Sequence, residues 1–157
     1  MPHQPVKLEF ESTLRTSRQE LWEWITNVDC LRKEMMPFLR MTTPSGITKL
    51  TDVQVVPEKP LFRSWILYFG FLPLDYSLLT LVSLTPGQGF VEQSPMMSMR
   101  TWRHTREILS RPDDPNVCLL RDTLEFEPRF HHAFTVWFVR RFFLHRHSVL
   151  QREHGDA

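Results

Sequence analysis

The chain has 157 residues, of which 41% are hydrophobic, so it is long and apolar enough to bury the core of one globular domain. Its formal net charge of +1 at pH 7 gives no general field that would attract nucleic acid, and we expect no nucleic-acid partner. No internal repeat or linker is visible, which predicts a single domain over residues 1–157.

The cysteines, the N-terminus and the longest apolar stretch together predict a cytoplasmic protein. Cys30 and Cys118 lie far apart and in no metal-binding or redox spacing. The N-terminus lacks the basic region and apolar run of a secretion signal. The apolar stretch at residues 65–84 is interrupted by Gly70 and Pro73, so we expect two buried strands there and no stable membrane insertion.

The beginning of the chain predicts one strand followed by two short helices. Apolar and polar residues alternate over residues 6–15, which indicates a strand with one buried face. Ser17 and Glu20 have the spacing of a capping box, which opens a helix that extends to about residue 28. We expect Asp29 to cap a second short helix over residues 30–36, which Pro37 ends.

The rest of the chain predicts an antiparallel meander that ends in a long helix. Strands are expected at residues 61–69, 76–84, 89–94, 97–109 and 117–127, with short ones near 38–42 and 53–56. The pattern from His132 to about residue 153 indicates a single helix of about five or six turns. This helix is the only element long enough to cover the concave face of the sheet. The sequence therefore predicts an α+β fold with a curved antiparallel sheet of six to seven strands, two short helices after strand one, and the long helix.

Strand parity places several polar side chains on one face of the expected sheet. Trp102, His104 and Arg106 share a face of their strand, because side chains two residues apart point to the same side. Asp122 lies on an otherwise apolar face of the next strand, and Glu92 precedes them on the strand before. If these faces coincide, all of these side chains point inward.

The C-terminal helix adds one more charged candidate. At about 100° per residue it has a broad apolar face, formed by Val136, Phe138, Val139, Phe142, Phe143, Val149 and Leu150. Arg146 falls in the middle of this face, where a charge needs a partner, and Asp122 or Glu92 could supply it. Two interpretations stay open: a polar cluster that anchors a ligand, or an ion-pair network that holds the helix to the sheet.

The order of elements and several short motifs resemble the START-like, or SRPBCC, helix-grip superfamily of lipid carriers, polyketide cyclases and related proteins. The resemblance is carried by a Gly-Phe-Leu-Pro turn at residues 70–73, Pro-Gly-Gln-Gly-Phe at 86–90, Trp-Arg-His at 102–104, and Asp-Thr-Leu-Glu-Phe-Glu-Pro at 122–128. The chain departs from the superfamily pattern at residues 94–97, where Ser-Pro-Met-Met replaces a frequent Gly-Pro-Phe turn, so the rim of the cavity is expected to differ there.

The resemblance implies a deep cavity between sheet and helix that accepts apolar ligands, but it does not imply an enzyme. The leading hypothesis is therefore binding or transport of a small hydrophobic ligand, such as a lipid, polyketide or aromatic molecule with one polar head. The candidate ligand-binding residues are Glu92, Trp102, His104, Arg106, Asp122, Phe142 and Arg146.

Two other function classes stay open. A cyclase or dehydratase would use His104 as acid or base, although a lone histidine on an inner sheet face is more often a hydrogen-bonded core residue. An interaction module would use the aromatic C-terminal helix to bind a protein or a membrane. The sequence contains no recognisable catalytic signature, which favours a non-catalytic binder.

No cofactor or metal is expected. His145 and His147 are two apart on a helix and diverge around its axis, so they do not converge on one metal ion. The sequence leaves assembly into a homodimer open.

Overall fold

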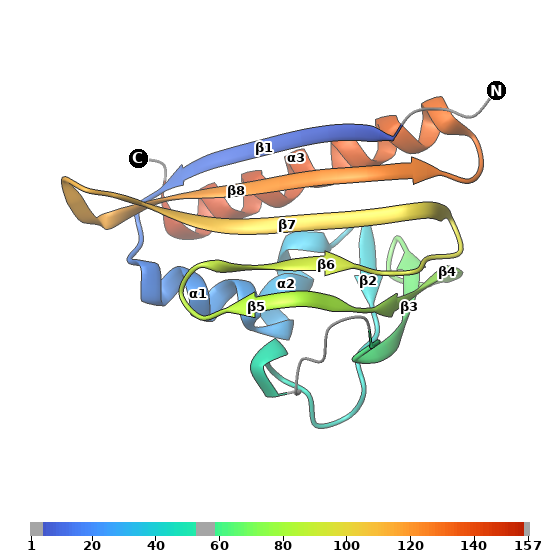
Figure 1. The fold of residues 1–157 in the computed structure, drawn as a ribbon, viewed down its shortest axis with the longest axis horizontal. Helices are drawn as coiled ribbons and strands as arrows, with labels where there is room; N and C mark the ends of the chain where they lie inside the picture. Colours follow the sequence, from blue (N-terminus) through green and yellow to red (C-terminus); the bar gives the residue numbers. More distant parts are fainter. Residues whose placement is uncertain (1–4, 53–58, 156–157) are drawn as a thin grey trace.

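The computed structural model describes residues 5–52 and 59–155, which form an α+β fold (Figure 1). In chain order its elements are β1 (Val6–Leu14), α1 (Arg18–Thr26), α2 (Val28–Met35), β2 (Leu39–Met41), the 3-10 helix η1 (Leu50–Asp52), β3 (Phe62–Tyr68), β4 (Leu72–Leu79), β5 (Leu81–Thr85), β6 (Gly89–Gln93), β7 (Met99–Arg111), β8 (Asp114–Pro128) and α3 (His132–His154).

The strands form two hydrogen-bonded sheets, and every pairing within them is antiparallel. The larger sheet has five strands in the order β1-β8-β7-β6-β5, and the smaller has three in the order β2-β3-β4. Helix α3 lies along the large sheet, behind β1 and β8 in Figure 1, whereas α1 and α2 lie near β5 and β6. The expected helix-grip architecture is confirmed, although the described residues divide eight strands between two sheets instead of placing six to seven in one.

The strand expected at residues 76–84 is two strands, because the ladder is interrupted at Thr80. The Thr80 N–H donates to Oγ of Ser94 (3.0 Å), and its carbonyl accepts from the N–H of Gln93 (3.0 Å). Its backbone is therefore satisfied by the end of β6 and the residue after it. The strand expected at residues 53–56 lies outside the described residues.

The elements predicted near the N-terminus are confirmed, except for the residue that caps the second helix. Alternate residues of β1 are buried, and Oγ of Ser17 caps α1 by accepting from the N–H of Glu20 (3.2 Å). The prediction that Asp29 caps the second helix is wrong. Oδ1 of Asn27 accepts from the N–H of Cys30 (3.1 Å), so α2 already begins at Val28.

Helix α3 closes the fold by packing its apolar face on the large sheet. The ring of Phe143 stacks on Phe10 of β1 with 5.6 Å between centroids. The opposite side of α3 is more apolar than the sequence pattern indicated, because Phe134, Trp137 and Leu144 are all at least half exposed. Among the described helices, none combines the length and the apolar character that crossing a membrane requires.

Gly89, at the start of β6, is held in a conformation and a space that only glycine fits. Its φ is +146°, and an added Cβ would lie 2.0 Å from the carbonyl oxygen of Arg106. Gly46 also has a positive φ, +91°, but an added Cβ there meets nothing within 4 Å.

We expect Gly89→Ala to lower the free energy of unfolding by several kcal/mol, because the new methyl group overpacks the site and also strains the backbone. Gly46→Ala is the matched control. It strains the backbone without a close contact, so the free energy of unfolding should fall by only about 1–2 kcal/mol. Equilibrium unfolding in urea measures both. Equal losses in the two variants would show that the close approach to Arg106 is unimportant.

Candidate functional site

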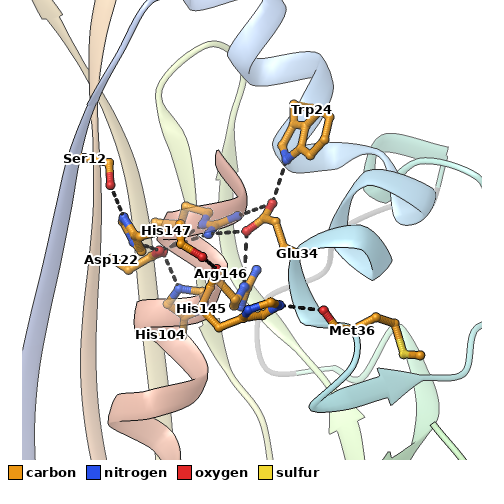
Figure 2. Close-up of polar contacts among 11 residues, drawn as sticks. Ser12, Trp24, Glu34, Met36, His104, Asp122, His145, Arg146 and His147 are labelled. Atoms are coloured by element: carbon orange, nitrogen blue, oxygen red, sulfur yellow. Dashed lines mark hydrogen bonds and ion pairs between the residues drawn. The ribbon is translucent and has the colours of Figure 1, made fainter. Parts of the chain in front are cut away.

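A layer of polar side chains crosses the core between the large sheet and the helices (Figure 2). Each member is at most 5% exposed, and the members are Ser12 of β1, Glu34 of α2, His104 and Arg106 of β7, Asp122 of β8, and Arg146 and His147 of α3. Apolar clusters lie on both sides of the layer. On β8, for example, Leu120 belongs to one cluster and Leu124 to the other, with Asp122 between them.

Arg106 is the centre of the layer, because its guanidinium joins the two carboxylates of the layer. It donates from Nε to Oδ1 of Asp122 (2.8 Å) and from Nη2 to Oδ2 of Asp122 (3.0 Å). Its Nη1 and Nη2 donate to Oε2 and Oε1 of Glu34 (3.1 and 2.8 Å). Trp24 adds an indole N–H to Oε2 of Glu34 (2.8 Å), so α1 and α2 are both tied to the sheet through this carboxylate.

Two histidines complete the surroundings of Asp122. Nε2 of His104 lies 2.6 Å from Oδ1 of Asp122, and Nε2 of His147 lies 2.8 Å from Oδ2. Since an ionised carboxylate only accepts, both Nε2 atoms carry the proton. Oγ of Ser12 lies 2.7 Å from Nδ1 of His147 and accepts from the side-chain amide of Gln151 (3.3 Å), so β1 is tied to α3 at this point.

The electrostatics of the layer keep both carboxylates ionised. Burial by itself would raise the pKa of Asp122, but the charge of Arg106 and the hydrogen bonds of the two histidines hold it well below its usual range. Burial likewise opposes ionisation of Glu34, but Arg106 and Arg146 lower its pKa. For Arg146, burial and repulsion by Arg106 outweigh Glu34 and lower the pKa.

Two adjoining cavities lie between the sheets and the helices. The larger, about 150 Å³, is lined by Trp102 and Phe142 among others, and the smaller, about 80 Å³, by Leu79 and Phe90 among others. The residues that line both are Met35, Met41, Glu92, His104 and Arg146. Three of these shared residues, Glu92, His104 and Arg146, are polar or charged, and other polar side chains, such as Asp75 in the larger cavity, line one cavity alone. A wider hollow of about 660 Å³ lies elsewhere, around the turn that contains Gly87.

The structure separates the predicted site residues into two groups. Five line the cavities: Glu92, Trp102, His104, Phe142 and Arg146. Arg106 and Asp122 line neither of these two cavities and lie behind them in the polar layer. Glu92 is half-buried and accepts from the indole N–H of Trp102 (3.1 Å), so it is not part of the layer.

The prediction that Asp122 or Glu92 pairs with Arg146 is wrong. Nε of Arg146 lies 3.2 Å from Oε1 of Glu34, which is its ion-pair partner. Asp122 is already occupied by Arg106 and the two histidines, and Glu92 is bonded to Trp102. Glu34 was not among the predicted site residues, and nothing in its local pattern distinguishes it from the exposed acidic residues of the same region.

His147 and Ser12 were also missed, although both had a usable signal. His147 follows Val136 by eleven residues, which places it about 20° from the edge of the apolar face of α3. Ser12 lies in phase with the buried residues of β1. Within the described part of the chain, no group of three or more His, Cys, Asp and Glu side chains could hold a metal ion.

Comparison with solved structures gives the class of fold. A START superfamily protein from Mycobacterium smegmatis is 10% identical, with a TM-score of 0.58 that covers 97% of each chain. The Zhui aromatase/cyclase from Streptomyces sp. R1128 is 10% identical, with a TM-score of 0.61 over 95% of this chain and 93% of that one. The major latex-like protein 151 from Panax ginseng is 7% identical, with a TM-score of 0.61 over 97% and 99%. The fold is START-like, as the sequence resemblance implied.

The family follows from the sequence itself. Residues 12–154 match the family described as "Domain of unknown function (DUF8410)", and the protein belongs to this family. A search of curated proteins finds no match.

The buried carboxylates predict a pH-dependent stability. The folded-state pKa values of Asp122 and Glu34 lie below the unfolded-state values of about 3.9 and about 4.3. The two carboxylates therefore contribute fully to the free energy of unfolding above the unfolded-state pKa values. This contribution is lost as the pH falls through the folded-state pKa values. Asp122→Asn should remove about 3 kcal/mol or more at neutral pH, because it leaves the charge of Arg106 poorly paired, and should flatten the acid dependence.

Urea unfolding between about pH 3 and about pH 7 measures this dependence. Asp113→Asn is the control, because the Asp113 side chain is 75% exposed and its loss should change little. An acid dependence as steep in Asp122→Asn as in the wild type would contradict the assignment.

Proposed function

We propose that the protein binds a small, largely apolar molecule with one polar head, in the two adjoining cavities between the sheets and α3. The observation that carries this proposal is the lining of these cavities: aromatic and aliphatic side chains form most of it, and Glu92, His104 and Arg146 meet at the junction. Concave, mostly apolar sites with few convergent polar groups are typical of small-molecule binding.

The size of the cavities favours a small ligand. The larger cavity has about 150 Å³, a volume at which an engineered apolar cavity accepts a benzene ring. The smaller cavity adds room for a short chain or a second small group. We therefore favour a ligand with one aromatic ring or a short aliphatic body over a phospholipid or another large lipid.

The first experiment is native mass spectrometry of the purified protein, followed by solvent extraction of whatever co-purifies. Thr135 lines the larger cavity from α3, so Thr135→Phe should fill the space and reduce the fraction of ligand-bound protein severalfold. Ala133→Phe adds the same ring two residues away at an exposed position and should retain the ligand. A bare mass in the wild type and no thermal stabilisation by small aromatic compounds would contradict the proposal.

A second candidate function is acid–base catalysis on such a ligand, in the manner of a cyclase or dehydratase. The observation that favours it is the setting of His104, which lines both cavities while Asp122 accepts from its Nε2. Nδ1 of His104 has no hydrogen-bond partner among the described residues, so it is free to act as a base. One neighbour of similar fold is an aromatase/cyclase, which supports testing the idea.

The test uses 4-hydroxy-4-phenyl-2-butanone, whose dehydration gives a conjugated ketone that is followed by its absorbance. His104 would remove a proton from the carbon beside the carbonyl and return it to the hydroxyl group, which leaves as water as the carbon–carbon double bond forms. We expect His104→Gln to lower the rate at least about 100-fold, and His131→Gln, at an exposed position, to leave it unchanged. A wild-type rate no higher than that of buffer would remove this candidate.

A further inference from the structure

Arg146 is a buried cation with most of its hydrogen-bonding capacity unused. Its side chain is 5% exposed, and its only hydrogen bond to the described residues runs from Nε to Glu34. Arg106, beside it, donates from Nε, Nη1 and Nη2 and makes four hydrogen bonds in total. The two Nη groups of Arg146 therefore carry N–H donors that have no acceptor among the described residues.

The surroundings of Arg146 keep it in place while leaving these donors available. Its guanidinium carbon lies 5.0 Å from the ring centroid of Phe143 and 5.7 Å from that of Phe142, both on its own helix. Arg146 also lines both cavities. A ligand that supplies acceptors at this point would form charge-assisted hydrogen bonds with these donors.

We propose that the polar head of the ligand is a carboxylic acid, bound as a carboxylate whose oxygens accept from Nη1 and Nη2 of Arg146. This inference rests on the proposed binding function and narrows it to one class of ligand. The planar fork of an arginine matches the two oxygens of a carboxylate, and such charge-assisted pairs are roughly twice as strong as neutral hydrogen bonds.

The charges of the site favour a carboxylate over other head groups. An amine would meet the positive charge of Arg146, and an alcohol oxygen would leave part of the fork without an acceptor. A phosphate would bring up to two negative charges to cavities that Glu92 and Asp75 also line. Glu34 and Asp122 already balance Arg106 and Arg146 within the layer, and Asp122 is held by three other side chains. A carboxylate therefore supplies two acceptors to the fork of Arg146 with one negative charge, fewer than a phosphate would bring.

The test compares three probes that share one apolar body and differ only in the head: 4-phenylbutyrate, 4-phenylbutanamide and 4-phenyl-1-butanol. Isothermal titration calorimetry on the full-length protein should show the acid binding at least about tenfold more tightly than the amide or the alcohol. In Arg146→Met the advantage of the acid should fall to about twofold or less, since only weaker long-range electrostatics remain.

Two further variants make the comparison specific. Arg146→Lys keeps the charge but loses the fork, so it should retain only part of the preference for the acid. If circular dichroism shows that Arg146→Met folds poorly, Arg146→Lys provides the comparison with the wild type instead. Arg140→Met removes an arginine from the exposed side of the same helix and should leave the preference unchanged.

The outcomes separate this inference from the proposed function. Equal binding of acid, amide and alcohol would overturn the carboxylate head and leave the binding function standing. A preference that survives intact in Arg146→Met would overturn the role of Arg146. Failure of all three probes to bind would count against both.

Discussion

The fully buried guanidinium of Arg106 is the constraint on which the rest of the structure depends. A cation removed from water needs opposite charge in close contact, and Arg106 obtains it from Asp122 on the neighbouring strand and from Glu34 on α2. The pairing with Asp122 is set by the register of β7 and β8, in which the two residues lie opposite each other. The pairing with Glu34 is different, because it requires a short helix from another part of the chain to dock against the sheet.

This requirement explains why the small helices and α3 have defined positions. Glu34 accepts from Trp24 of α1, Arg106 of the sheet and Arg146 of α3, so one carboxylate connects three layers of the fold. Removing any partner would leave a buried charge incompletely satisfied, whereas the apolar clusters on either side tolerate some repacking. The polar layer therefore specifies the arrangement of the elements more strictly than the apolar contacts around it.

The two interpretations of the polar cluster apply to different members of it. Arg106 and Asp122 use their hydrogen-bonding capacity within the protein, which is the behaviour of a structural network. Arg146 and His104 line the cavities and retain groups without a partner in the part of the chain that the structure describes, as expected of residues that meet a ligand. The same layer thus both positions the helices and presents polar groups to the cavities.

The sequence by itself determined the elements and the inward face of the sheet. The alternation in β1, the parity of His104, Arg106 and Asp122, and the phase of Arg146 on α3 are properties of local geometry, in which side chains repeat every two residues in a strand and about every 3.6 in a helix. These periods do not depend on what the inward face of a strand or helix packs against. They can therefore be recognised in the sequence before the fold is known. They also placed Arg146 in an apolar environment, which correctly implied a buried partner.

Only the tertiary structure decided which groups meet. Glu34 became the partner of Arg146 because α2 packs against α3, a contact between residues 112 positions apart in the chain. The break at Thr80 likewise depends on Ser94 and Gln93, which supply its backbone bonds from the following strand. Local periodicity carries no information about such long-range pairings, since they arise from how separate faces fit together. The sequence could therefore indicate a row of polar side chains at an apolar cavity. The fold determined which of these side chains bond to one another and which keep hydrogen-bonding groups that a ligand can meet.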